Sequence, residues 1–503
     1  MDTYPSSATL DAPFLVPSWR ERPDTGPAAP APAQERLLLL LPEGSLAQVV
    51  ADRCAETGAR LSAAVAGDRF HPDDPASVAA LIEEEFASRP PDAVLCAWAL
   101  GEGPGAEGDA AAAYRTFARL QALGAALAGR PAGAGPDRAV RLIIATDRAH
   151  RAVPGDTARP YQAVADGPAL ALGLEADRLS VRTADVDTTE GDGAIAAALA
   201  AEVAARGEGA VAWRAGRRLA LEYVPFAHSA PAHSPFTPAG TYVITGGFGA
   251  IGLALARRIA EVPDTSVVLI GRNLPDGGGA PEGAPDGAGA GRHRPAEELA
   301  RLRASGAKVL AFACDVADRP RLAEVIGKAR AETGRIDGVL HLAGVVDDTR
   351  LHLLEPGLAG RVMAPKTAGT LALDELCPDA RFLVLFSSVQ NLSGAYGHGA
   401  YIAANRFLDS YAAAADTDAR QVVAINWTLW GEVFGMAAPP AETEAAAGAV
   451  RGWLATAEGI AALERILVHR PGPQVAVCPD GYEAQLHRAG SRAAAARERA
   501  ARA

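Results

Sequence analysis

Cysteine and aromatic residues are scarce in this sequence of 503 residues. It has five cysteines, and aromatic residues make up only 5% of the chain. The cysteines are scattered and form no CxxC pair, which argues against a disulfide framework and a cysteine-rich zinc site. The ten histidines include no HExxH spacing, so we expect no metal centre. Isolated thiols of this kind are typical of the reducing cytoplasm, where we expect the protein to act.

A surplus of positive charge is also absent. Lys and Arg number 48 against 60 Asp and Glu, which gives a formal net charge of -12. Nucleic acids and anionic membranes bind basic surfaces, so we expect neither as a partner. The longest purely apolar run near the start is Leu37–Leu41, far shorter than the roughly 20 residues of a membrane span. No basic segment followed by an apolar run opens the chain, so we expect no signal peptide.

The length and the hydrophobic content predict a folded protein with more than one domain. Hydrophobic residues make up 49% of the chain, too many for a mostly disordered protein. A chain of 503 residues exceeds what a single core ordinarily fills. We predict a leader or linker over 1–35, in which Phe14–Trp19 could form a short strand, a first folded unit over 36–238, a second over 239–485, and a tail or linker over 486–503.

Apolar runs alternate with helical patterns along the first unit. The predicted strands are Leu37–Leu41, Leu61–Ala66, Ala93–Trp98, Val140–Ile144 and Leu179–Val186. The predicted helices are Leu46–Glu56, Ala76–Ala87, Ala110–Leu127 and Ile195–Ala205. The segment Pro225–Pro238, rich in Pro, Ser and His, indicates a linker to the second unit.

The second unit repeats this alternation. Its predicted strands are Thr241–Thr245, Val267–Ile270, Val309–Ala313, Gly338–Leu342, Phe382–Phe386, Val422–Asn426 and Gln474–Cys478. The low-complexity segment Gly277–Gly291 indicates a loop. Alternating strands and helices predict an α/β fold in which each unit is a doubly wound parallel sheet.

A glycine-rich turn follows the first strand of the second unit. Tyr242–Gly252 reads YVITGGFGAIG, and Gly247, Gly249 and Gly252 have the GxGxxG spacing between a strand and a helix. Glycines let this turn approach a pyrophosphate, and the helix N-terminus supplies N–H groups, as in Rossmann-like dinucleotide-binding folds. A tight turn without a ligand is the alternative. The first unit has Pro42–Ser45 at the equivalent turn and lacks the glycines, so we expect it to be a degenerate, structural Rossmann-like unit without a nucleotide.

Residues after the next three strands of the second unit are candidates to bind the rest of the dinucleotide. Arg272 stands where an acidic residue would favour NAD, so it favours the 2′-phosphate of NADP, unless it is an ordinary surface arginine. Asp315 and Val316 could flank an adenine. Ala343 and Gly344 are small enough for a cofactor to lie against the strand end.

Four polar residues form a candidate catalytic set. Tyr401 and Asn405 are four residues apart on a predicted helix and share one face, and Ser388 ends a predicted strand. Reduction of a carbonyl by hydride needs a proton donor and groups that hold the oxygen. Tyr401 can donate the proton, Ser388 can hydrogen-bond the carbonyl, and Asn405 can anchor a proton relay. Lys366 can lower the pKa of the phenol, directly or through the cofactor ribose.

Together these motifs resemble the short-chain dehydrogenase/reductase superfamily. The resemblance rests on the following residues and motifs: Thr245–Gly252 (TGGFGAIG), His341–Gly344 (HLAG), Lys366, Ser388, Tyr401 and Asn405. Asn405 occupies the place of the usual lysine of Tyr-x-x-x-Lys while a lysine lies earlier, which is similar to ketoreductase domains of modular polyketide synthases. Such domains carry a truncated Rossmann-like structural subdomain before the catalytic one.

The resemblance implies an activity and its partners. We expect NADPH-dependent reduction of a β-ketoacyl group on an acyl carrier protein, with other synthase domains as further partners. Cofactor contacts are implied for Thr245 and Ile251, and for Lys366 and Tyr401 in addition to their catalytic roles. NWTLWG at Asn426–Gly431 resembles the segment that precedes the lid, which would be Glu432–Gly452.

The resemblance also suggests a stereochemical type. Val346, Asp347 and Asp348 stand where B-type domains carry Leu-Asp-Asp, and no Trp occurs between Ser388 and Tyr401. This suggests a B-type enzyme with a D-configured product. Ala403, in place of a proline, suggests that an α-substituent is not epimerised. His398 could touch the substrate or be a surface-loop histidine.

Three alternatives remain open from the sequence. The chain could be a catalytically silent, structural ketoreductase domain, although the complete catalytic set argues against this. It could reduce an α-ketoacyl group on a peptidyl carrier in a nonribosomal peptide synthetase. It could also be a nucleotide sensor that reduces no carbonyl.

Overall fold

The computed structural model describes residues 14–22, 35–87, 89–128, 139–176, 178–205, 209–275, 295–431 and 453–478. Most of the predicted leader, the loop Gly277–Gly291, the predicted lid Glu432–Gly452 and the tail 486–503 lie outside the described residues. Among the helices that the structure describes, none is long and apolar enough to cross a membrane.

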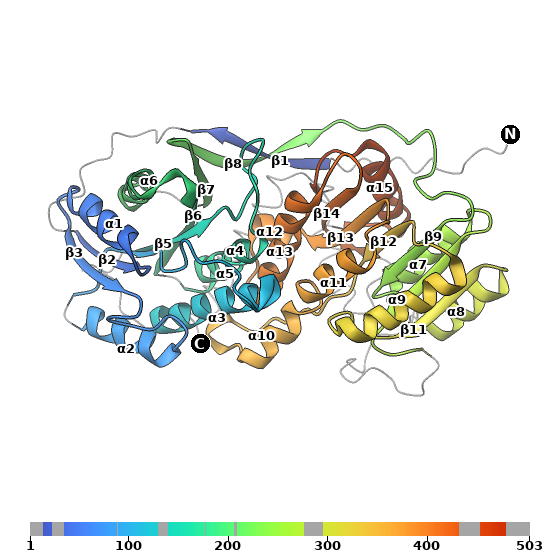
Figure 1. The fold of residues 1–503 in the computed structure, drawn as a ribbon, viewed down its shortest axis with the longest axis horizontal. Helices are drawn as coiled ribbons and strands as arrows, with labels where there is room; N and C mark the ends of the chain where they lie inside the picture. The colour runs from blue at the N-terminus through green and yellow to red at the C-terminus, as the bar shows by residue number, and fades with distance from the viewer. Residues whose placement is uncertain are drawn as a thin grey trace, which may run out of the picture.

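One 15-stranded sheet runs through both halves of the molecule (Figure 1). In the first half its strands are β1 (Phe14–Glu21), β2 (Arg36–Leu41), β3 (Arg60–Val65), β4 (Ala93–Cys96), β5 (Val140–Asp147), β6 (Leu179–Val186), β7 (Gly209–Arg214) and β8 (Arg217–Phe226). In the second half they are β9 (Thr241–Thr245), β10 (Ser266–Gly271), β11 (Lys308–Ala313), β12 (Gly338–His341), β13 (Phe382–Ser388), β14 (Gln421–Trp427) and β17 (Gln474–Val477). A separate pair joins β15 (Leu429–Trp430) to β16 (Trp453–Leu454).

The strand order confirms the predicted α/β fold and adds a connection that the sequence does not predict. The second half has the order β11-β10-β9-β12-β13-β14-β17, all parallel, and the first half has β7-β6-β5-β4-β2-β3, also parallel. The strands β1 and β8 join them into one sheet, where the sequence predicts two. Phe14–Trp19, placed in the leader by the sequence analysis, is therefore part of the sheet.

The joining strands reverse the direction of the sheet between the halves. β1 is antiparallel to β17 and to β8, and β8 is antiparallel to β7. The parallel strands of the first half therefore run opposite to those of the second. As a result, the carboxyl ends of the second-half strands share an edge of the sheet with the amino ends of the first-half strands.

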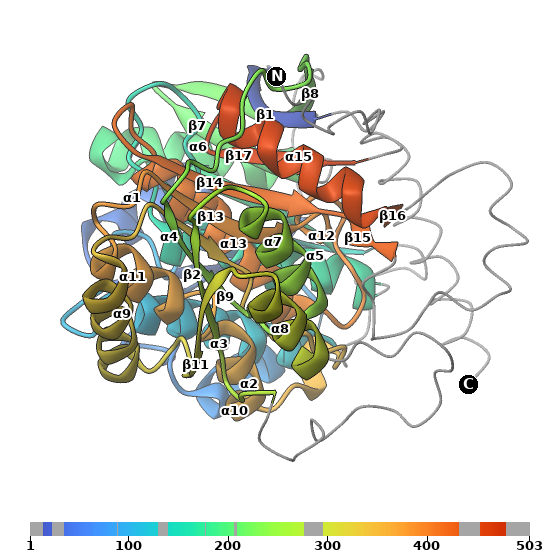
Figure 2. The same cartoon turned by 90° about the vertical axis from the view of Figure 1, so that its right-hand side faces the viewer.

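Helices cover both faces of the sheet. In the first half they are α1 (Ser45–Ala55), α2 (Pro75–Phe86), α3 (Gly108–Ala128), α4 (Pro160–Ala163), α5 (Asp166–Glu175), η1 (Thr188–Glu190) and α6 (Asp192–Ala204). In the second half they are α7 (Ala250–Ala260), α8 (Pro295–Ala304), α9 (Arg319–Thr333), η2 (Leu351–Leu353), α10 (Pro356–Met363), α11 (Ala368–Leu376), α12 (Gln390–Ser393), α13 (Gly399–Ala415) and α15 (Thr456–His469). Figure 2 shows α7, α8 and α15 on one side of the second half and α9 and α11 on the other.

The helix α13 lies at the joint between the two halves. One core cluster contains Phe117 of α3 together with Ala403 and Phe407 of α13, so the halves share buried apolar surface. Gly167 of α5 touches α13 so closely that a Cβ there would lie 2.5 Å from the backbone nitrogen of Ala403. Burial of apolar area stabilises this contact, and only glycine permits the approach.

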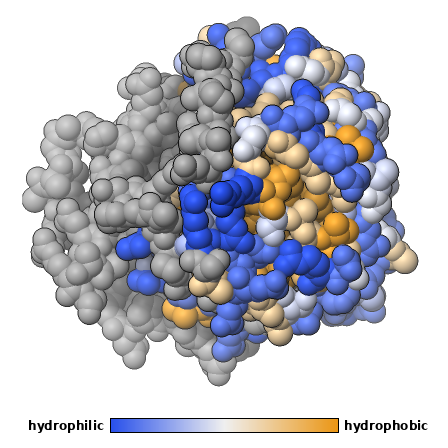
Figure 3. Space-filling model, turned by 90° about the vertical axis from the view of Figure 1, so that its left-hand side faces the viewer, coloured by the Kyte–Doolittle hydropathy of each residue, from blue (hydrophilic) through white to orange (hydrophobic). Residues whose placement is uncertain are grey.

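The first half ends in an edge strand and a polar network. Figure 3 shows the end of the molecule where β3 is the outermost strand, with an apolar area bordered by hydrophilic surface.

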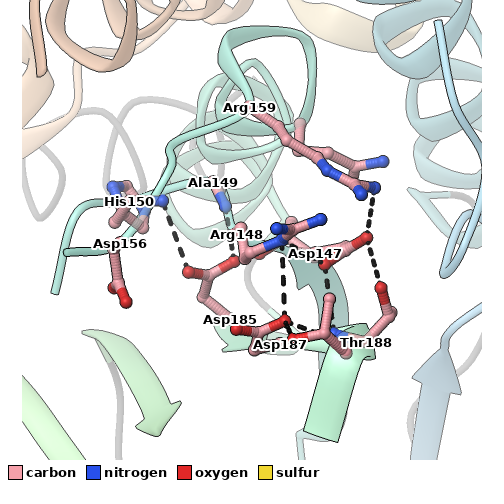
Figure 4. A network of polar contacts seen from close by, with 12 residues as sticks. Asp147, Arg148, Ala149, His150, Asp156, Arg159, Asp185, Asp187 and Thr188 are labelled. Carbon is pink, nitrogen blue, oxygen red and sulfur yellow. Dashed lines mark hydrogen bonds and ion pairs between the residues drawn. The ribbon is translucent and has the colours of Figure 1, made fainter. Parts of the chain in front are cut away.

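At the carboxyl ends of β5 and β6, Asp147 and Asp185 accept several hydrogen bonds (Figure 4). Thr188 Oγ1 donates to Asp147 at 2.8 Å, and Arg214 Nη2 donates to Asp185 at 2.7 Å. Local side chains thus occupy the strand ends where a ligand binds in open α/β sheets.

Candidate active site

The glycine turn has the close packing that a phosphate-binding turn requires. It joins β9 to α7, with Gly246 at a φ of 66°. A Cβ on Gly247 would lie 2.7 Å from the carbonyl oxygen of Ile244, and a Cβ on Gly252 would lie 2.8 Å from that of Gly246. Gly249 is the N-cap of α7 and provides no side-chain cap. The first N–H groups of α7 are therefore available to an anion such as a pyrophosphate.

The predicted adenosine-side residues lie at the ends of neighbouring strands. Arg272 follows β10, is exposed, and has no ion pair or hydrogen bond with the residues that the structure describes. Asp315 is also exposed after β11, and its Oδ1 accepts from the Ala317 N–H at 2.9 Å. Val316 is buried with its side chain against Gly369, so only its backbone could face a cofactor. A free guanidinium at this place fits a 2′-phosphate.

Thr245 is buried at the carboxyl end of β9. Its hydroxyl is 2.6 Å from Nδ1 of His341, and Nε2 of His341 is 2.9 Å from the carbonyl oxygen of Pro365. Because that carbonyl can only accept, Nε2 carries the proton and Nδ1 accepts from Thr245. Burial, and then the charge of Lys366, lower the pKa of His341 to about 3, so the ring is neutral. Thr245 therefore supports the strand ends, and Ile251 likewise packs against the core.

Lys366 is buried beside the candidate catalytic tyrosine. Its Nζ donates to the Phe386 carbonyl oxygen at 2.6 Å and lies 6.0 Å from the centre of the Tyr401 ring. Gly344 makes room for it, since a Cβ there would lie 2.9 Å from Cε of Lys366. Burial lowers the pKa of Lys366 to about 8, while the Asp409 carboxylate acts in the opposite direction. The Lys366 ammonium thus lies over the face of the Tyr401 ring.

Tyr401, Ser388 and Asn405 come together at the carboxyl end of β13. Burial raises the pKa of Tyr401, while hydrogen bonds with Asn405 and Ser388 lower it. The side chain of Asn405 is fully buried, and its Nδ2 donates to the Tyr401 carbonyl oxygen at 2.9 Å. Its Oδ1 has no partner within the described residues, which fits a bound water. The structure therefore brings together all four residues of the predicted catalytic set.

A buried carboxylate that the sequence analysis missed holds α13 against the sheet. Asp409 accepts from Asn391 Nδ2 at 2.6 Å, from Asn426 Nδ2 at 2.9 Å and from Gln474 Nε2 at 3.0 Å. It lies eight residues after Tyr401, on the same helix face. That i, i+4, i+8 spacing from Tyr401 was the one signal in the sequence that could have pointed to it.

The predicted stereocontrol residues lie in a loop that contacts the segment before α13. Val346 is 50% exposed, Asp348 is exposed, and Asp347 Oδ1 accepts from the Thr349 N–H at 2.9 Å. The ring of His398 packs edge-on against Tyr401, with centroids 6.1 Å apart and an interplanar angle of 63°. His398 is thus a neighbour of the phenol.

The segments that flank the predicted lid lie side by side. β15, before it, pairs in parallel with β16, after it. Leu429 of β15 is 56% exposed.

A protein-family model and several known proteins match parts of this chain. The KR domain family model matches residues 240–432. Erythronolide synthase EryA3 of Saccharopolyspora erythraea is 38% identical over 317 residues, which are 62% of this chain and 9% of that synthase. The spectinabilin synthase protein NorA' of Streptomyces orinoci is 33% identical over 306 residues, or 8% of its length. The chain thus spans less than a tenth of the length of either relative.

Solved structures resemble the chain over nearly its whole length. The first ketoreductase of the tylosin PKS has 28% identity and a TM-score of 0.70, and the match covers 94% of this chain and 93% of that one.

Proposed function

Because this chain is a ketoreductase domain of the modular polyketide synthase type, we propose that it reduces a β-ketoacyl thioester to a β-hydroxyacyl thioester with NADPH. Domains of this type are oxidoreductases of the short-chain dehydrogenase/reductase superfamily that reduce β-keto groups in polyketide synthesis with a nicotinamide cofactor. The proposal adds the phosphorylated cofactor, the carrier and the configuration of the product.

The observation that carries the proposal is the buried ammonium of Lys366 beside Tyr401. The Tyr401 hydroxyl donates its proton to the carbonyl oxygen as that oxygen gains charge, and Ser388 donates a second hydrogen bond to it. The positive charge of Lys366 stabilises the phenolate that remains. Asn405 Oδ1, which has no partner within the described residues, would accept from a water that returns the proton to Tyr401.

The described residues fit a phosphorylated dinucleotide. The glycine turn and the N-terminus of α7 would hold the pyrophosphate, and Arg272 would hold the 2′-phosphate. Asp315 and the backbone of Val316 would flank the adenine, and Ala343 and Gly344 would leave space beside the strand end. When bound, the reduced nicotinamide supplies the hydride.

The proposed carrier and configuration rest on the similarity to ketoreductase domains of modular polyketide synthases. We assign the acyl carrier protein as the partner that delivers the thioester, with other synthase domains next to it. Val346, Asp347 and Asp348 lie in the loop that contacts the segment of His398, and together they would orient the carbonyl for a D-configured product. With Ala403 at its place in α13, an α-substituent would keep its configuration.

The first half serves as a scaffold in this proposal. The division into a structural unit over 36–238 and a catalytic unit over 239–485 fits the two sets of parallel strands. The strand ends of the first half, where a nucleotide would bind, are filled by the network of Asp147 and Asp185. Catalysis therefore depends on the second half, positioned by the first.

The test is NADPH oxidation by the purified chain with β-ketoacyl and α-ketoacyl thioesters, followed by chiral analysis of the products. We expect turnover with the β-ketoacyl substrate and a D-configured alcohol. A preference for the α-ketoacyl thioester would favour a role in a nonribosomal peptide synthetase. Tight NADPH binding without turnover of either would indicate a structural domain or a sensor and contradict the proposal.

A further inference from the structure

We propose that Glu175, in the half without a nucleotide-binding turn, is a positioning residue. It holds two loops beside Tyr401 at a fixed separation and thereby controls the stereochemical outcome. The inference deepens the proposed function and rests on it. The two loops are the stereocontrol loop, residues 346–351, and the pre-helix loop, residues 396–398.

The carboxylate of Glu175 bridges the two loops directly. Its Oε2 accepts from the backbone N–H of Leu351 at 2.8 Å, and its Oε1 accepts from that of Gly397 at 3.0 Å. One side chain of the first half thus satisfies a backbone donor in each of two loops of the second half. Burial raises the pKa of Glu175, and the Leu351 and Gly397 N–H groups lower it, so the two bonds favour the charged carboxylate and restrain both loops.

The loops also touch each other, so neither can move alone. Gly397 has a φ of 78°, and a Cβ there would lie 2.2 Å from the carbonyl oxygen of Asp348. The Arg350 guanidinium lies 4.9 Å from the centre of the Tyr396 ring, within reach of a cation–π interaction. A shift of either loop would break one of these contacts.

Glu175 itself is held on a helix that packs firmly against α13. It is the last residue of α5, which begins with Asp166. The Asp166 carboxylate pairs with the Arg406 guanidinium of α13 at 3.3 Å, and Gly167 lies in backbone contact with Ala403. The direction of the first-half strands explains the placement, because α5 leads into the amino end of β6 at the edge where the active site lies.

The bridge acts where the face of the carbonyl is selected. The stereocontrol loop carries Val346, Asp347 and Asp348, and the pre-helix loop ends in His398, whose ring contacts Tyr401. The separation of the loops therefore limits how a β-ketoacyl group can turn relative to the phenol. Misplacement by about 1 Å can cost about 100-fold in rate, so a small shift can let the opposite face compete.

The variant Glu175→Gln tests the proposal in the full chain. An amide has one acceptor oxygen, so one of the two backbone N–H groups would face an NH2 donor and lose its partner. We expect the fraction of the minor stereoisomer to rise about tenfold and KM for the thioester to increase, with NADPH affinity unchanged. Glu175→Asp keeps both acceptor oxygens but is one methylene shorter, so it should restore the selectivity only in part.

A matched control is Glu190→Gln. Glu190 also accepts from a backbone N–H, that of Ala215 at 2.7 Å, within the first half alone. The Glu190→Gln variant should therefore have the wild-type product ratio and KM. If Glu175→Gln leaves the product ratio and KM at wild-type values, whether or not it lowers the melting temperature, the inference is wrong. Wild-type protein that turns over no thioester would instead contradict the proposed function.

Discussion

The Nζ atom of Lys366 lies 6.0 Å from the centre of the Tyr401 ring, although 35 positions separate the two residues in the sequence. Lys366 lies between α10 and α11, and its ammonium is held by the Phe386 carbonyl. Asn405, four residues after Tyr401, donates to the tyrosine backbone. The lysine thus approaches the tyrosine ring from a different element, while the asparagine occupies the same helix face as the tyrosine.

The charge of Lys366 predicts the alkaline limb of the pH profile. Burial lowers the pKa of Lys366 from 10.5 to about 8, so the ammonium loses its proton above about pH 8. We expect kcat/KM to fall above that pH, because the pH dependence of kcat/KM reports the pKa values of groups in the free enzyme. Asp409→Asn removes the carboxylate that opposes this lowering and should move the limb to lower pH. Asp264→Asn, at an exposed position, should leave the alkaline limb at the wild-type pH. If Asp409→Asn also leaves the limb at the wild-type pH, Asp409 does not influence the pKa of Lys366.

The guanidinium of Arg272 predicts the cofactor preference. Arg272→Ala should weaken NADPH binding by roughly 10- to 100-fold, as expected for a charged hydrogen bond of about 1.5–3 kcal/mol, and change NADH binding little. Fluorescence titration with both cofactors measures the difference. Arg301→Ala, another exposed arginine, is the control. Equal losses for the two cofactors would show that Arg272 does not contact the 2′-phosphate.

The glycine turn predicts a strict requirement at Gly252. A methyl group there would lie 2.8 Å from the Gly246 carbonyl oxygen and from the Cα of Gly247, both backbone atoms of the turn. Gly252→Ala should therefore abolish dinucleotide binding, measured by calorimetry. Gly327→Ala, where a Cβ meets nothing within 4 Å, should bind normally and be slightly more stable. Normal binding by Gly252→Ala would contradict the assignment of the turn.

The neutral His341 predicts loss of stability in acid. Its folded-state pKa of about 3 lies below the ordinary 6.5, so its contribution is complete above pH 6.5 and is lost as the pH falls toward 3. His341→Gln removes this titration, so the free energy of unfolding should depend less steeply on pH over that range. Urea unfolding at several pH values measures it, with the exposed His71→Gln as control. Identical slopes for His341→Gln and wild type would be inconsistent with a buried neutral ring.

Most strands can be predicted from their apolar patterns, whereas the helix α5, between the two halves, cannot. The predicted strand Leu179–Val186 has the bounds of β6. In contrast, α5 reads DGPALALGLE and shows no clear helical period, because most of its residues are buried against the sheet and α13. Its glycine is in backbone contact with Ala403, a tertiary contact that no local pattern encodes. The role of β1 in joining the halves depends in the same way on distant partners.

Within the candidate site, too, the residues that could be predicted are those whose signal lies in one short segment. Ser388, Tyr401 and Asn405 could be predicted because each residue type and spacing has a chemical reason within one short segment. Glu175 could not, since its two partners Leu351 and Gly397 lie 176 and 222 positions away. A half-buried glutamate at a helix end has no sequence signal until the fold brings its partners together.

The most direct test of the account compares Tyr401→Phe with the wild type in a single experiment. NADPH affinity is measured by titration, and reduction of a β-ketoacyl thioester is followed with the cofactor saturating. The phenol proton is required in the reduction, so turnover should fall by roughly 100-fold or more while NADPH affinity stays nearly the same. Turnover by Tyr401→Phe at the wild-type rate would show that the phenol beside Lys366 is not the proton donor.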